Sequence, residues 1–175
     1  MTPIKLSKYV QDPFRESSEW HHVAAIADQL HAHLSTKDAL QKIEEVNQPG
    51  KSSARVQDTF LEFAQELGFE SEKTGLFCSD DLALRPDYFL ELDSTGIILE
   101  VERGKTTINN MDLLDFWKCH LCPAASYLFL LVPQALRQNE SMSPRKEFAT
   151  VDRRLSQFFK TDNYTSVRGL CLFGY

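Results

Sequence analysis

Residues 86–105 read PDYFLELDSTGIILEVERGK, and the rest of the fold can be predicted outward from this segment. Apolar and polar residues alternate over 84–92, and residues 96–103 form a second such run that is rich in β-branched side chains. A period of two is typical of a β-strand with one buried face. The four residues from Asp93 to Gly96 have the composition of a tight turn. The stretch therefore predicts two antiparallel strands joined as a hairpin.

Three carboxylates gather on one face of this predicted hairpin. Alternation places Asp87 on one face of the first strand, and Glu100 and Glu102 on the corresponding face of the second. With a two-residue turn, we expect Asp87 to lie opposite Glu102 and Phe89 opposite Glu100. Like charges that face each other destabilise a sheet by about 0.2 to 1 kcal/mol per pair. A divalent cation between them would reverse the sign of that contribution.

These acids have two interpretations. They can coat a solvated sheet face, as is common in antiparallel hairpins, or they can line a partly covered cleft that holds a cation. The neighbouring side chains imply that the other face of the hairpin is buried: Tyr88, Leu90, Leu99 and Val101. Helices before and after the hairpin would cover much of the acidic face, which favours the cation site. Ligands that are all oxygen suit Mg²⁺.

Around the hairpin the sequence predicts one α/β domain. The expected elements are helices over 16–47 and 53–67, a strand over 69–77, the hairpin, a helix from Asn109 or Asn110 to Pro123, a strand over 126–132, a helix over 144–160 and a strand over 167–173. In the helix after the hairpin, one side is apolar, with Leu113, Leu114, Trp117 and Leu121. The core order is helix, three strands, helix and strand.

The composition limits the classes of protein that fit the chain. Its 175 residues, 42% of them hydrophobic, suffice for one core, and the net charge of −6 excludes a basic polymer-coating protein. Nucleic acid would have to meet a local patch. The first ten residues lack the apolar segment of a signal peptide, and no apolar run approaches the roughly 20 residues needed to cross a bilayer. With its four cysteines, the chain is expected to be cytoplasmic and without a membrane partner.

The hairpin also carries a family resemblance. Pro86-Asp87, followed by a strand with Glu100-Val101-Glu102, resembles the signature of the PD-(D/E)XK nuclease superfamily, which includes type II restriction endonucleases. The superfamily's core order of helix, three strands, helix and strand matches residues 53–132. The resemblance implies a restriction endonuclease-like αβββαβ fold over residues 51–175, an α/β fold in which helices flank a mixed central sheet. Residues 1–50 would form a helical arm within the same compact unit.

The resemblance implies a metal-dependent DNA endonuclease that hydrolyses phosphodiester bonds, of restriction type or from a mobile genetic element. Its metal would be Mg²⁺, or Mn²⁺, held by Asp87, Glu100 and Glu102. The superfamily usually has lysine where this chain has Glu102, although some restriction enzymes have a second glutamate there. Lys105, just past the strand, or Lys118 on the following helix could supply the missing positive charge to the catalytic site.

Two further groups of residues are candidates for the site. Near the helix start that follows the hairpin, where backbone N–H groups favour phosphate, four residues are expected to contact nucleic acid: Arg103, Lys105, Asn109 and Asn110. Three polar residues of the helix over 53–67 are candidates for supporting the metal site: Arg55, Gln57 and Glu62. The alternatives are ordinary loop and cap chemistry for the first group and a solvated helix face for the second.

Cys119, His120 and Cys122 invite a zinc interpretation, because soft ligands at this spacing can bind that ion. They provide at most half of a site. A helix that carries them beside apolar residues more simply places the cysteines in or near a core.

Two other functions remain open at the level of sequence. One is a non-catalytic nucleic-acid-binding or assembly module that keeps the nuclease fold, which the missing lysine and the negative net charge permit. The other is a nuclease for branched DNA or RNA. A domain of this size that cuts both DNA strands usually acts as a homodimer, and the helical arm before Asn47 is a candidate for the contact.

Overall fold

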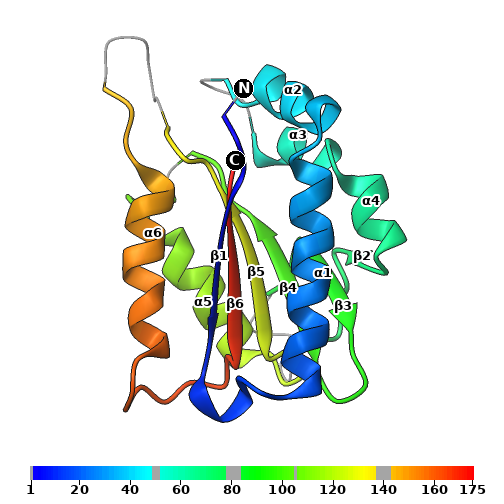
Figure 1. The fold of residues 1–175 in the computed structure, drawn as a ribbon, viewed down its shortest axis with the longest axis vertical. Coiled ribbons are helices and arrows are strands. Elements are labelled where there is room, and N and C mark those ends of the chain that lie inside the picture. The colour runs from blue at the N-terminus through cyan, green and yellow to red at the C-terminus, as the bar shows by residue number, and fades with distance from the viewer. Residues whose placement is uncertain (1, 49–51, 78–83, 105, 137–142) are drawn as a thin grey trace.

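The structure, a computed structural model, describes residues 2–48, 52–77, 84–104, 106–136 and 143–175 (Figure 1). Its elements are β1 (Lys5–Val10), η1 (Asp12–Phe14), α1 (Ser18–Leu34), α2 (Lys37–Val46), α3 (Ser53–Asp58), α4 (Leu61–Glu66), β2 (Glu70–Ser71), β3 (Tyr88–Glu91), β4 (Gly96–Val101), α5 (Met111–Leu121), β5 (Tyr127–Val132), α6 (Glu147–Leu155), η3 (Ser156–Phe159) and β6 (Gly169–Gly174). Among the described helices, none is both long and apolar enough to cross a bilayer.

The strands form one six-stranded mixed sheet in the order β1-β6-β5-β4-β3-β2. Strands β4, β5 and β6 run parallel to one another, while the other three neighbouring pairs are antiparallel. Every residue of β4, β5 and β6 is buried, as expected for parallel strands with helices on both faces. The predicted α/β class, with a mixed sheet flanked by helices, is confirmed.

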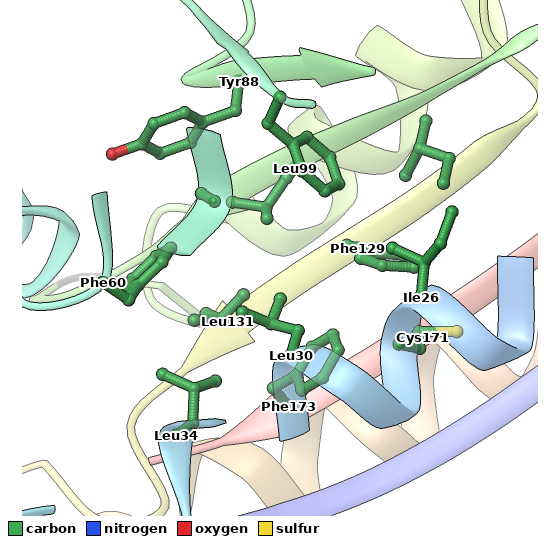
Figure 2. Close-up of a cluster of buried hydrophobic side chains, with 14 of the residues drawn as sticks. Ile26, Leu30, Leu34, Phe60, Tyr88, Leu99, Phe129, Leu131, Cys171 and Phe173 are labelled. Carbon is green, nitrogen blue, oxygen red and sulfur yellow. The ribbon is translucent and has the colours of Figure 1, made fainter. Parts of the chain in front are cut away.

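Two apolar cores lie on opposite faces of this sheet. On one face, helices α1 to α4 cover the sheet, and Figure 2 shows residues of α1 packed against aromatic residues of β5 and β6. On the other face, α5 and α6 pack on Ile98, Leu128 and Leu130 (Figure 1). Alternate residues of β4 therefore enter different cores, and this fixes which side of the sheet each acid of the hairpin occupies.

The helix predicted over 16–47 is two helices. The Ser17 hydroxyl accepts a hydrogen bond from Trp20 N and caps α1, while the Thr36 hydroxyl accepts one from Ala39 N and caps α2. Each cap satisfies a backbone N–H that has no partner within its helix. The predicted helix over 53–67 is likewise divided, into α3 and α4.

The predicted strands differ from the observed ones at both edges of the sheet. Residues Lys5–Val10, for which no element was predicted, form the edge strand β1, where the polar residues Lys5 and Lys8 are well tolerated. The strand expected over 69–77 is reduced to Glu70–Ser71. Strands β5 and β6 lie where they were predicted.

The hairpin is antiparallel as predicted, but its expected register is wrong by two residues. Tyr88 pairs with Leu99 and Phe89 with Ile98, so Asp87 does not face Glu102, and Phe89 does not face Glu100. The turn causes the shift. Leu92 N donates a hydrogen bond to Thr95 O at 2.7 Å, so the two residues of the turn are Asp93 and Ser94, one position earlier than expected. A shift of two residues preserves the period of the strand, so the acids keep their predicted face.

Most of the apolar side predicted for α5 does not face the core: of Leu113, Leu114, Trp117 and Leu121, only Leu113 packs against it. Its buried residues are Asp112, Asp115, Phe116 and Cys119. Leu114, Trp117 and Leu121 are exposed by 54%, 47% and 50%. The acidic positions turn inward because cations meet them there: Arg154 Nε lies 3.3 Å from Asp112 Oδ2, and Lys118 Nζ 3.4 Å from Asp115 Oδ1.

Candidate functional site

Four carboxyl groups and one ammonium form a cluster where β4 ends. Asp87 precedes β3, Glu100 lies in β4, Glu102 directly follows it, and α5 contributes Asp115 and Lys118. Glu100 is on the same strand face as Ile98, which packs in the core beneath α5 and α6. The strand therefore directs its acids toward α5. We call these five residues the acid cluster.

Lys118 joins two buried carboxylates of the acid cluster. Its Nζ donates to Glu100 Oε1 at 2.7 Å and lies 3.4 Å from Asp115 Oδ1. Glu100 is only 3% exposed and Asp115 only 1%, so Glu100 does not belong to a solvated sheet face. A buried ion pair must offset the cost of removing both charges from water, and losing one partner leaves the other uncompensated.

Asp87 is held at the edge of the cluster by a hydrogen bond that fixes its carboxylate. Its Oδ2 accepts from the backbone N–H of Val101 at 2.8 Å, and the nearby polar side chain of Gln57 in α3 lowers the pKa of this carboxyl. The hydrogen bond ties the start of β3 to the end of β4. Burial raises the pKa of Asp87, an effect that the Val101 hydrogen bond and the charge of Lys118 partly offset.

The other acids also have raised pKa values, mainly because of burial. Burial, and then the charges of Asp115 and Asp87, raise the pKa of Glu102 to about 8. Burial raises the pKa of Asp115 to about 6, although Lys118 opposes the shift, and it raises the pKa of Glu100 well above its ordinary value. Burial alone would lower the pKa of Lys118, but Glu100 and Asp115 raise it. Near neutral pH, bound protons or an added cation would therefore stabilise the acid cluster.

The acid cluster can offer only carboxylate oxygens as ligands, and oxygen ligands suit a hard divalent cation. Mg²⁺ is commonly held by one or two carboxylates together with water and substrate phosphate. Within the described residues, no three His, Cys, Asp or Glu side chains lie close enough together to hold a metal ion by themselves. Lys118 is bonded to Glu100, one of the predicted ligands. The residues therefore fit a magnesium site that water and phosphate complete, not a cage made by the protein alone.

The four residues predicted to contact nucleic acid differ in whether their side chains are seen to bind other parts of the chain. Arg103 donates to Asn47 Oδ1 at 3.1 Å and to Gln48 O, so its guanidinium is bound to the end of α2. Asn110 Oδ1 accepts from Arg154 at 2.7 Å, and its side chain makes no cap for α5. Asn109 is exposed, and Lys105 lies outside the described residues. Arg103 and Asn110 thus already have partners within the chain.

Of the three polar residues predicted to support the site, the structure brings only Gln57 to the acid cluster. Arg55 and Glu62 line a separate cleft of about 470 Å³ beside α2. A further cavity of about 620 Å³ lies near β1, α2 and α6, and none of its lining residues belongs to the cluster. Cys119 and Cys122 are buried, as the core interpretation of these cysteines expected.

Asp115 belongs to the site but was not predicted from the sequence. Asp112, Asp115, Phe116 and Cys119 have helical spacing and define the buried side of α5. This periodicity is present in the sequence, but Leu114, Trp117 and Leu121 form a more apolar pattern on another side of the same helix.

Comparisons with known proteins yield a likeness of fold. No protein-family model matches the chain, and no curated protein matches its sequence. Among solved structures, the restriction endonuclease BglII in complex with a 16-mer DNA is similar over 99% of this chain and 78% of its own, with 11% sequence identity and a TM-score of 0.46. This likeness concerns the overall fold and says nothing of the activity of this chain.

Proposed function

We propose that this protein is a metal-dependent DNA endonuclease of the PD-(D/E)XK type, in which Asp87 and Glu100 are ligands of Mg²⁺ or Mn²⁺ and Glu102 is a third ligand or the acceptor of the proton of the attacking water. The observation that carries the proposal is the buried acid cluster, in which Glu100 is 3% exposed and the pKa of Glu102 is raised to about 8. Burying acids together is costly for a fold, and such groups concentrate at functional sites. The hairpin motif and the order of the elements support the same proposal.

The cluster residues have distinct roles in this proposal. Phosphodiester hydrolysis needs a water made nucleophilic and positive charge near the phosphate, and a bound divalent metal supplies both. Asp87, fixed by Val101 N–H, and Glu100 hold the ion. Glu102 is a third ligand or accepts the proton of the attacking water. Lys118 supplies the ammonium that the motif lacks at position 102, since it already lies 2.7 Å from Glu100. Lys105 remains a second candidate for that charge.

The central test is cleavage of supercoiled plasmid and of defined duplex, branched and RNA oligonucleotides, with and without Mg²⁺ or Mn²⁺. We expect duplex cleavage that requires the metal and stops on addition of a chelator. Cleavage restricted to branched DNA or RNA would change the substrate class. A folded protein that binds DNA and cuts nothing would favour the non-catalytic module. The Lys118–Glu100 pair favours that second function, because it compensates Glu100 without a metal.

Metal binding itself can be measured without any substrate. We expect millimolar Mg²⁺ or Mn²⁺ to raise the melting temperature of the wild type, because an ion that binds only the folded state stabilises it. The Asp87→Ala/Glu100→Ala double variant should show no such increase. Glu44→Ala, in which an exposed acid of α2 is lost, is the matched control and should respond like the wild type. An equal increase in all three proteins would rule out the proposed site.

A further inference from the structure

The cavity of about 620 Å³ beside β1, α2 and α6 has the size and the walls of a small-molecule site. It lies at the end of the sheet where Figure 1 marks both ends of the chain. Its large apolar lining residues are Ile4, Leu40, Ile43, Phe148 and Tyr175, and all but Leu40 are buried. Ligand sites commonly measure roughly 300 to 1,000 Å³ and combine apolar walls with a few polar groups. We call this space the α2–α6 cavity.

The two aromatic walls of the α2–α6 cavity are held in place by the fold. The Phe148 ring lies against Gly174 of β6, where an added Cβ would come within 2.5 Å of the ring. The backbone N–H of Phe148 donates to Pro133 O at 3.1 Å, and that of Tyr175 donates to Val132 O at 3.0 Å. Because these contacts need no ligand, binding would require little further ordering of the two residues.

The charged side chains of the cavity favour an anion. Lys5 and Lys146 contribute two positive charges, and Glu44 contributes one negative charge. Lys5 Nζ lies 5.6 Å from the centre of the Phe148 ring, so one ammonium is next to the apolar wall. Within the described residues, no carboxylate forms an ion pair with either lysine. A molecule with an apolar body and an anionic group would therefore satisfy both parts of the lining.

Two residues of the cavity also hold the segment that follows β4. Tyr175 lines the cavity, and its hydroxyl donates to the backbone oxygen of Glu102 at 2.8 Å. Asn47 lines it as well, and its Oδ1 accepts from Arg103 Nε at 3.1 Å. Glu102 belongs to the acid cluster. A molecule in the cavity would thus contact two groups that position Glu102 and its neighbour.

We propose that the α2–α6 cavity is a regulatory site for a small amphipathic anion, whose binding shifts the Glu102–Arg103 segment through Tyr175 and Asn47. Binding and the shift of the segment require neither metal nor DNA. Only an effect on cleavage rests on the proposed function. Since coupling between two sites is reciprocal, an ion bound at Glu102 would in turn change the affinity of the cavity for the anion.

Binding is tested by fluorescence titration with anilinonaphthalene sulfonate, a probe that joins aromatic rings to one anionic group. We expect the folded wild type to bind one equivalent. Ala149→Trp fills the cavity from its wall and should weaken binding by at least about 10-fold with an unchanged circular dichroism spectrum. Gln157→Trp is the matched control, because Gln157 is exposed and outside the cavity; it should bind like the wild type.

Trp117→Ser tests whether the probe binds instead to the exposed apolar residues of α5. It should leave the affinity unchanged. Wild-type affinity in Ala149→Trp, or loss of binding in Trp117→Ser, would overturn the proposed site.

The charge of the ligand is tested by competition. Decanoate should displace the probe, whereas decylamine, with the same chain and the opposite charge, should not. The double variant Lys5→Met/Lys146→Met should bind the probe about 5-fold more weakly, because two favourable charges are lost. Failure of decanoate to displace the probe, or equal displacement by decylamine, would contradict the assignment of an anion.

The coupling is tested by the amide chemical shifts of Glu102 and Arg103 in metal-free protein. Both should move as the probe binds. Tyr175→Phe keeps the ring in the cavity wall but removes the hydroxyl that donates to Glu102 O, so the probe should bind with wild-type affinity while these shifts become smaller. Shifts that are absent in the wild type, or unchanged in Tyr175→Phe, would overturn the regulatory role. None of these measurements uses cleavage, so a protein that cuts nothing would refute the proposed function and leave this inference standing.

Discussion

Replacing Glu102 with Gln is expected to lower metal-dependent DNA cleavage by about 10²- to 10⁴-fold without loss of folding. Gln keeps the shape of the side chain but cannot bind a metal as a carboxylate or accept a proton. Folding is preserved because Glu102 is an acid placed among other acids, and its raised pKa, about 8, shows that its charge is unfavourable in the metal-free fold. The measurement is the single-turnover rate on a duplex that the wild type cleaves.

Glu91→Gln is the matched control for this substitution, because Glu91 lies on the same hairpin and is exposed. It should cleave at the wild-type rate. Lys105→Ala should cost less than Glu102→Gln, since Lys105 follows the end of the strand. If Lys105→Ala abolished cleavage while Glu102→Gln left it intact, the role given to Glu102 would be wrong.

Lys118→Met is expected to lower the free energy of unfolding by about 3 to 5 kcal/mol near pH 8, the largest loss of stability among the substitutions proposed for this protein. The substitution removes the ammonium that compensates two buried carboxylates, Glu100 and Asp115, at 2.7 and 3.4 Å. Urea unfolding of the metal-free protein measures the effect. Lys42→Met removes an ion pair of similar length on the surface of α2, at 2.8 Å from Asp38, and should leave the stability nearly unchanged because water and salt screen an exposed pair.

The loss should shrink as the pH falls toward about 5. The folded-state pKa of Glu102 is about 8, above its ordinary value of 4.5. Between these values the folded state binds more protons than the unfolded state, so stability falls as the pH rises. Asp115 has the same effect on stability between its ordinary pKa of 3.8 and its folded-state pKa of about 6. At low pH these acids are protonated and neutral, so loss of the Lys118 ammonium destabilises the folded state less. A pH-independent loss would show that Lys118 stabilises the fold by packing alone.

The hairpin shows how far a sequence pattern defines a structure. Its strands, their antiparallel pairing and the face that carries Glu100 follow from a period of two, which constrains every residue. The register does not follow, because Asp93-Ser94 and Ser94-Thr95 are both acceptable centres for a two-residue turn. The Leu92–Thr95 hydrogen bond, which decides between them, has no distinct signature in the sequence.

The errors at α5 and β1 have a different origin. Hydrophobic periodicity assigns the apolar side of a helix to the core, but Lys118 and Arg154 make buried positions favourable for Asp115 and Asp112. Those partners become neighbours only through tertiary structure. Strand β1 likewise depends on a strand at the other end of the chain, with which it pairs. No local window of sequence contains either relationship.

The pairing of β1 with β6 has a consequence for how the protein is made. It joins Lys5 to Gly174 and Val10 to Gly169, so nearly the entire chain forms the loop that this contact closes. Such long-range contacts are slow to form, because the entropy of loop closure is lost before the contact can repay it. During synthesis β1 emerges before β6 and stays unpaired until β6 has been made. Until it docks, the buried strand β6 has an unpaired edge that can join another chain, so the nascent protein is most exposed to aggregation just before its sheet is complete.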